Sequence, residues 1–247
     1  MKKMPCLFQR DFHERGDPRG PFTMRPDVAP GCEWVLYRQG EASVKLDGSA
    51  CLVRDGKLYK RLDCKKDRKT GEYKARPLGA IPCQEPDEAT GHWPHWVPVG
   101  DEPDSRWHRE AWTNEGCVPG VRALVDGTYE LCGPRLQGNP QQLDRHVLLR
   151  HGEQVVPWDE LFGQVREVDE VFAFHALRAY LEREPTREGL VFTRGVLDSD
   201  GELVRCKIRR DDYRLPWPPL SEACTHPVII DQMPPYCARC GAQVEGL

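Results

Sequence analysis

The stretch of sequence that most constrains the fold runs from Ala42 to Leu46 and stops at Asp47-Gly48. Apolar and polar residues alternate along it, which is typical of a β-strand with one packed face. On such a strand Val44 faces a core, while Lys45 and Asp47 face the other side as an amine beside a carboxylate. This arrangement could present a lysine nucleophile. Taken alone, the pattern favours a surface strand with a solvated lysine, because so short a motif often recurs by chance.

Two Asp-Gly pairs predict hairpins in this part of the chain. The first is Asp47-Gly48, and the second, Asp55-Gly56, separates short β-prone runs at 50–54 and 57–62. Asp-Gly between such runs is a strong hairpin signal, because both residues tolerate the positive φ angles of a tight turn.

The clearest helix is predicted from Asp169 to Glu184. Apolar residues recur there at helical spacing, Asp169 is a suitable N-cap, and Pro185 follows the end. Strands are predicted over 127–133 and 146–150. The chain is therefore expected to mix helices with strands.

Two later strands are predicted on either side of a loop at residues 198–201. A four-residue loop would place residue 192 opposite Lys207. Because cross-strand partners share a face, Glu188, Lys207 and Arg209 would then lie on one side of the sheet. A loop of odd length would reverse this parity.

The composition favours a soluble protein. Of the 247 residues 30% are charged, the mean hydropathy is −0.64, and no apolar run is long enough to span a bilayer. The first residues lack the apolar core of a secretory signal, so we predict a cytoplasmic location without membrane association. Eight of the eleven cysteines are scattered singly, which buried free thiols explain better than disulfides do.

The net charge of −4 argues against a nucleic-acid binder, but the charge is unevenly distributed. Between Lys57 and Arg76, nine lysines and arginines stand against three acidic residues. Such a run could follow a phosphate backbone or form a solvated charged loop. The sequence leaves both interpretations open.

Four short motifs occur in order along the chain: Lys45-Leu46-Asp47-Gly48-Ser49, Tyr129-Glu130-Leu131-Cys132-Gly133, Glu188-Gly189-Leu190-Val191 and Lys207-Ile208-Arg209. They resemble motifs I, III, IV and V of the covalent nucleotidyltransferases, which include polynucleotide ligases and mRNA capping enzymes. One such motif is weak evidence, whereas four in order are strong. The resemblance implies that Lys45 attacks the α-phosphate of a nucleotide.

Four further segments carry a closer resemblance: Met4-Pro5-Cys6, Arg61-Leu62-Asp63, Trp96-Val97-Pro98-Val99 and Gln137-Gly138-Asn139-Pro140. They are similar to the ATP-dependent 5′-to-3′ RNA ligases of animals and their microbial relatives, over about residues 4–230. This resemblance implies an α+β fold, with an adenylation domain at residues 1–215 whose antiparallel sheets enclose the nucleotide, and a C-terminal extension at 216–247. The implied partners are ATP and RNA ends with a 5′-phosphate and a 3′-hydroxyl, and we expect a monomer.

The resemblance also implies roles for individual residues. Lys45 would accept AMP, with Lys207 and Arg209 as catalytic cations, although many ligases have a lysine at the position of Arg209. Glu188 would bind Mg²⁺ or Mn²⁺. The nucleotide would be bound by nine residues: Val44, Lys45, Asp47, Gly48, Arg61, Glu130, His151, Glu188 and Lys207. A lysine attacks only as the neutral amine, which desolvation, the neighbouring cations and a metal ion would all favour.

The remaining three cysteines cluster with a histidine near the end of the chain. Cys224, His226, Cys237 and Cys240 have the residue types and spacing of a closed, tetrahedral zinc site. Zinc would stabilise a tail too short to fold unaided, with RNA contact as a secondary role. Free thiols are the alternative.

Two other functions remain open from the sequence. A capping-type guanylyltransferase shares the lysine chemistry and would use GTP, but the residues after Arg209 are too few for the OB domain that capping enzymes usually append. A zinc-containing RNA-binding module with an inactive nucleotidyltransferase fold is the non-enzymatic possibility. The set Lys45, Glu130, Glu188 and Lys207 argues against it, because loss of function would not preserve these charged residues.

Overall fold

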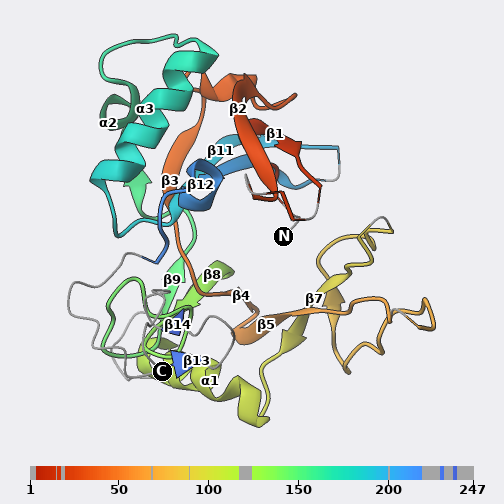
Figure 1. Ribbon diagram of the computed structural model, residues 1–247. Coiled ribbons are helices and arrows are strands. Elements are labelled where there is room, and N and C mark those ends of the chain that lie inside the picture. Colours follow the sequence, from red (N-terminus) through yellow and green to blue (C-terminus); the bar gives the residue numbers. More distant parts are fainter. Residues whose placement is uncertain are drawn as a thin grey trace. The chain divides into compact units, whose positions relative to one another are not determined.

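The computed structural model describes residues 4–14, 16–17, 20–67, 69–88, 90–116, 124–199, 201–218, 229–230 and 236–237. The chain divides into two compact units (Figure 1). One comprises residues 47–151, and the other comprises residues 4–46 together with the chain from residue 152 onward. Both contain antiparallel sheets with helices, so the expected α+β class is confirmed at this level. The domain boundary proposed at residue 215 stays a prediction.

The discontinuous unit is built on a four-stranded antiparallel sheet with strand order β10-β3-β11-β12. Its strands are β3 (Glu41–Lys45), β10 (Val155–Val156), β11 (Gly189–Leu197) and β12 (Leu203–Arg209). Two shorter pairs belong to the same unit: β1 (Phe8–Phe12) with β2 (Phe22–Val28), and β13 (Ile229–Ile230) with β14 (Tyr236–Cys237). Its helices are η1 (Glu33–Val35), α2 (Trp158–Phe162), α3 (Glu170–Arg183) and η3 (Arg210–Tyr213).

One face of this sheet is the packed face. Its fully buried side chains include Leu190, Phe192 and Ile208, which form one core with Leu177 and Leu181 of helix α3. The predicted helix is confirmed, and so is its cap, because the Asp169 carboxylate accepts the Phe172 N–H at 2.8 Å. The opposite face of the sheet is thereby left for polar side chains.

The continuous unit, residues 47–151, is built on a six-stranded antiparallel sheet with order β6-β7-β5-β4-β8-β9. Its strands are β4 (Ser49–Arg54), β5 (Lys57–Asp63), β6 (Ile81–Pro82), β7 (Pro94–Pro98), β8 (Gly127–Cys132) and β9 (Val147–Arg150). Its helices are η2 (Pro103–Ser105) and α1 (Arg106–Gly116). Helix α1 contributes Ala111 to a core with one face of the sheet, where Cys51, Val53 and Leu131 are buried.

The Asp55-Gly56 hairpin is confirmed. Strands β4 and β5 pair antiparallel across it, with Asp55 at φ 51° and Gly56 at φ 68°, the positive values that a two-residue hairpin turn requires.

The hairpin predicted at Asp47-Gly48 is wrong. Strand β3 pairs with β10 and β11 instead of β4, so both of its edges are occupied. Gly48 is required by a close approach of the backbone, because a Cβ there would lie 2.1 Å from the carbonyl oxygen of Leu131 on β8. The sequence pattern predicts that Gly48 is part of a hairpin turn, whereas in the structure Gly48 makes room for the neighbouring strand β8.

The predicted register of β11 and β12 is wrong by one residue. Lys207 lies opposite Val191 instead of residue 192, and Arg209 lies opposite Gly189. The connection is residues 198–202, an odd number, and the pairing shifts again between Thr193 and Leu197. Glu188 precedes the first residue of β11, and its carbonyl oxygen accepts the backbone N–H of Arg210 at 2.8 Å, whereas residue 211 was the predicted partner.

In the part of the chain that the structure describes, no helix combines the length and the apolar character needed to cross a membrane.

Candidate functional site

The polar face of the four-stranded sheet gathers three cations. Lys45 pairs with Gly189, and Gly189 pairs with Arg209 on the next strand, so Lys45 and Arg209 flank a residue without a side chain. Lys207 projects on the same face two residues before Arg209, opposite Val191. A Cβ at Gly189 would lie 2.1 Å from the Ile208 carbonyl oxygen, so only glycine fits between the two strands.

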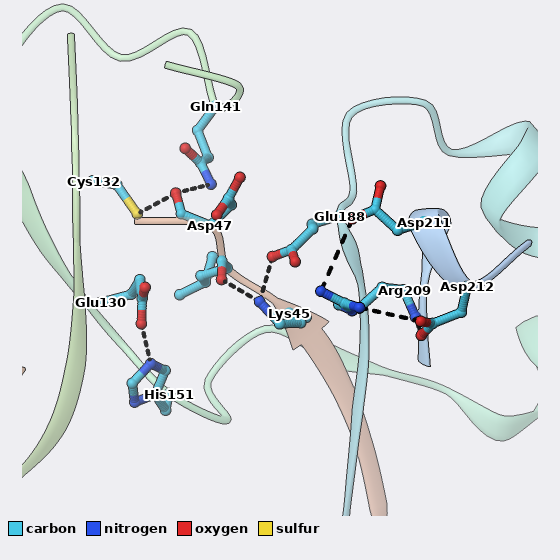
Figure 2. Close-up of polar contacts among 11 residues, drawn as sticks. Lys45, Asp47, Glu130, Cys132, Gln141, His151, Glu188, Arg209, Asp211 and Asp212 are labelled. Carbon is cyan, nitrogen blue, oxygen red and sulfur yellow. Dashed lines mark hydrogen bonds and ion pairs between the residues drawn. The ribbon is translucent and has the colours of Figure 1, made fainter. Parts of the chain in front are cut away.

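Glu188 brings a carboxylate to this group of cations. The Lys45 amine donates a hydrogen bond to the Glu188 carboxylate and a second to the Leu46 carbonyl at 3.3 Å (Figure 2). The Lys45 and Glu188 side chains are only 20% and 10% exposed, so the ion pair is shielded from water. Shielding strengthens their attraction, and Lys45 is therefore held at a fixed place at the end of β3.

Lys207 is a partly buried cation among cations. Burial lowers the pKa of Lys207, and the charges of Arg209 and Lys45 lower it further, against the opposing charges of Glu188 and Asp212. Both of its backbone polar groups are hydrogen-bonded to the N-terminal segment, since its N–H donates to Pro5 at 3.0 Å and its carbonyl accepts from Leu7 at 2.8 Å. An anion bound here would relieve the repulsion between these cations.

Arg209 is oriented by a buried carboxylate that the sequence analysis missed. The Asp212 side chain has no exposed surface, and its Oδ1 accepts from Arg209 Nη2 at 3.2 Å. Its Oδ2 accepts the Arg209 backbone N–H at 2.8 Å. Burial opposes the charge of Arg209, but the carboxylates of Asp212, Asp211 and Glu188 together outweigh it and raise the pKa of the guanidinium. A signal existed in the sequence, because an aspartate three residues after the end of a strand can cap a following helical turn.

A second missed residue comes from far away in the chain. Arg10, on β1, donates to Oδ1 of Asp212, the oxygen that also accepts from Arg209. Two guanidinium groups therefore share one buried carboxylate. No local pattern predicts a partner separated from Asp212 by 202 positions.

In the six-stranded unit, three of the predicted nucleotide-binding residues lie on one face of the sheet. Ala50 pairs with Glu130, and Arg61 lies one strand further along in the same row of side chains. Nε2 of His151 lies 2.8 Å from the Glu130 carboxylate, and the His151 backbone N–H donates to Thr128 at 3.1 Å. These side chains are partly exposed, and the opposite face carries the core against α1.

Three other predicted nucleotide-binding residues, Asp47, Gly48 and Val44, take part in backbone contacts and packing. The Asp47 carbonyl accepts from Gln141 Nε2 at 3.2 Å and from the Cys132 thiol at 3.7 Å (Figure 2). Gly48 packs against β8, as described above. Val44 is on the packed face of β3, next to the core of the discontinuous unit.

The basic run from Lys57 to Arg76 is partly neutralised in the structure. Lys60 pairs with Asp104 at 2.8 Å, and Lys66 pairs with Glu88. Arg76 lies over the Trp93 ring, 4.8 Å from its centroid. The segment is thus held by specific contacts, and part of its charge is not available to a phosphate backbone.

The structure allows one test of the predicted metal sites. In the described ranges, no group of three or more His, Cys, Asp or Glu side chains could hold a metal ion. Mg²⁺ and Mn²⁺ need fewer protein ligands when nucleotide phosphates and water complete the shell, and the single carboxylate of Glu188 fits that requirement. Cys224, His226, Cys240 and the Cys237 side chain lie outside the described residues, so the zinc site stays a prediction.

Neither a family model nor a curated protein is found to match this chain.

Proposed function

We propose that the protein is an ATP-dependent RNA ligase with a nucleotidyltransferase fold, which joins a 5′-phosphate end to a 3′-hydroxyl end. The observation that carries the proposal is the polar face of the four-stranded sheet. It presents a shielded lysine, Lys45, beside the carboxylate of Glu188 and on the same face as Lys207 and Arg209. The four motifs in order identify these residues as the nucleophile and its phosphate-binding partners.

The proposed first step forms a bond between Lys45 Nζ and the α-phosphorus of ATP. The bond from that phosphorus to the bridging oxygen breaks, pyrophosphate leaves, and the amine loses a proton. Lys207 and Arg209 supply positive charge where the phosphate oxygens gain negative charge, which is the main protein contribution to phosphoryl transfer. The ion pair with Glu188 must open before attack, because the ammonium form has no lone pair.

A divalent ion fits this proposal through Glu188. Mg²⁺ or Mn²⁺ held there would supply further positive charge to the phosphates. Its binding and the Lys45 ion pair would use the same carboxylate, so the metal would compete with the ammonium for Glu188.

The later steps rest on the family resemblance. AMP would pass from Lys45 to the 5′-phosphate of an RNA end, and a 3′-hydroxyl would then attack that phosphate with loss of AMP. The resemblance assigns Asp47, Gly48, Arg61, Glu130 and His151 to nucleotide binding. Arg61, Glu130 and His151 share one partly exposed face of their sheet, which is compatible with that assignment.

The test is incorporation of label into the protein. We would incubate it with Mg²⁺ and α-labelled ATP or α-labelled GTP, denature it, and measure label on the chain. Lys45→Ala should abolish the label, whereas the exposed strand lysine Lys57 offers a matched control, Lys57→Ala, that should retain it. Joining of a 5′-phosphorylated RNA would then be measured.

The outcomes separate the three candidate functions. Label from ATP that depends on Lys45 supports the ligase. Label from GTP alone would instead identify a guanylyltransferase. Absence of label from either nucleotide, in protein shown by mass to be free of bound AMP, would contradict both enzymatic functions and favour the RNA-binding module.

A further inference from the structure

We infer that Asp212 and Arg10 are positioning residues that hold Arg209 in place to bind the phosphates of the nucleotide. The inference rests on the proposed function for the identity of the anion. Its structural basis is independent of that function, since it lies in the contacts of one buried carboxylate.

The Asp212 carboxylate is surrounded by donors. Besides the Arg209 side chain and backbone and the Arg10 guanidinium, Cys6 places its sulfur 3.7 Å from Oδ2. Two guanidinium groups thus share this one buried carboxylate. A carboxylate that served only to neutralise Arg209 would not need the second cation.

Some of the Arg209 guanidinium donors have hydrogen-bond partners in the part of the chain that the structure describes, and others have none. Nη2 donates to Asp212, and Nη1 lies 3.9 Å from Asp211, beyond hydrogen-bond distance. Among the described residues Nε has no hydrogen-bond partner although it is buried. A buried donor without a partner is rare and needs an explanation, and an anionic ligand beside Lys207 would supply one.

The N-terminal part of the chain also contacts Lys207 and Asp212. Residues 5–7 run parallel to β12 and hydrogen-bond to both backbone groups of Lys207, with Cys6 directly beside it. Arg10 follows on β1, which holds it against Asp212. Lys207 and Arg209 are thus supported by contacts from residues 5–10.

A positioning role and a purely electrostatic role predict opposite results. Asp212→Asn removes a negative charge beside an anion site, which by Coulomb attraction alone should strengthen anion binding. If Asp212 orients Arg209, the same change should weaken binding instead. Asn retains an oxygen that can accept the Arg209 backbone N–H, so the turn at η3 keeps its cap.

The experiment measures tripolyphosphate binding by calorimetry, and ATP-dependent labelling of Lys45 in a single turnover, with the full chain. Asp212→Asn should weaken tripolyphosphate binding and slow labelling by about tenfold each, as expected for a misplaced charge-assisted contact. Asp211→Asn is the matched control, because Asp211 is exposed and makes no hydrogen bond to Arg209; it should change neither quantity by more than about twofold.

A double variant separates positioning from general structural damage. In an Arg209→Ala background, Asp212→Asn should cause no further loss in either quantity, because residues that act through one another are not additive. A further loss there, or unchanged or tighter tripolyphosphate binding by Asp212→Asn alone, would overturn the inference. Should Asp212→Asn fail to fold, Arg10→Lys provides the test, because it keeps the positive charge but not the guanidinium that contacts Asp212: tripolyphosphate binding should fall if Arg10 positions Asp212 and Arg209, whereas unchanged binding would contradict the inference.

The two readouts keep this inference distinct from the proposed function. Tripolyphosphate binding that requires Arg209 and Asp212, in a chain that labels with neither ATP nor GTP, would support the inference and contradict the ligase. Labelling that is equal in the Asp212 and Asp211 variants would support the ligase and overturn the inference. Absence of both binding and labelling would contradict both.

Discussion

At the scale of single residues, the polar face of the four-stranded sheet brings three cations together on neighbouring strands. Lys45, Lys207 and Arg209 project from neighbouring strands on one face, where the carboxylates of Glu188, Asp211 and the buried Asp212 oppose them. Like charges brought together destabilise a folded chain unless a ligand compensates them. Such an arrangement therefore favours a site that binds phosphate.

Lys207→Met is expected to stabilise the protein without ligand by about 1 kcal/mol, because it removes a cation from a partly buried, cationic place while retaining the apolar stem. Because the pKa of Lys207 is lowered on folding, the unfolded chain binds more protons between the lowered value and 10.5. The wild-type stability therefore rises with pH across this window, and the advantage of the variant, complete at neutral pH, shrinks there. Thermal unfolding at pH 7 and pH 10 tests this, with exposed Lys57→Met as control; a destabilised Lys207→Met would contradict it.

At the scale of elements, local signals predicted helix α3 and several of the strands, while partners in the sheet were set by distant parts of the chain. Helix α3 and its Asp169 cap follow from spacing and capping within 16 residues of sequence, and the Asp55-Gly56 turn follows from two residues. The pairing of β3 with β11 joins Lys45 to Gly189, and no local pattern distinguishes it from a hairpin at Asp47-Gly48.

In the candidate site, too, local motifs identified residues, while long-range contacts could not be predicted. Lys45, Glu188, Lys207 and Arg209 were identified from short motifs, and the structure places all four in one unit. The register of β11 and β12 was missed because it depends on the 198–202 connection and on an irregularity that sequence does not mark. Arg10 was missed because only the tertiary fold brings it to Asp212.

Gly48→Ala tests whether Gly48 is required by the close approach of strand β8. The added Cβ would lie 2.1 Å from the Leu131 carbonyl oxygen, and separating β4 from β8 to relieve the overlap should cost at least about 2 kcal/mol. Gly56→Ala is the matched control: Gly56 has a positive φ of 68° but no atom within 4 Å of the added Cβ, so about 1 kcal/mol is expected. Urea unfolding compares the two. Equal losses would show that backbone strain, and not the close approach of β8, explains Gly48.

At the scale of the whole molecule, the chain leaves one unit at residue 46 and returns to it at residue 152. The four-stranded sheet therefore joins segments that the whole 47–151 unit separates in the sequence, because β3 pairs with β11 and residues 5–7 pair with β12. Such long-range pairing makes loop closure entropically costly. We infer that removing residues 5–7 would disturb β12 beside the Lys45 site and not only the removed segment.

The predicted zinc site concerns the C-terminal extension at residues 216–247, where a zinc ion would cross-link the segments that carry its four ligands. Protein purified without added metal should contain about one zinc per chain, as a closed site of four ligands requires. Cys237→Ser with Cys240→Ser should lose that zinc, whereas Cys83→Ser, which lies outside the predicted set, should retain it. Because metal binding and folding are coupled in such small sites, a chelator should also make residues 216–247 more susceptible to protease while the ATP-dependent labelling of Lys45 continues. Zinc retained by the double variant would contradict the proposed ligands, and wild-type protein free of zinc would leave free thiols as the explanation of these cysteines.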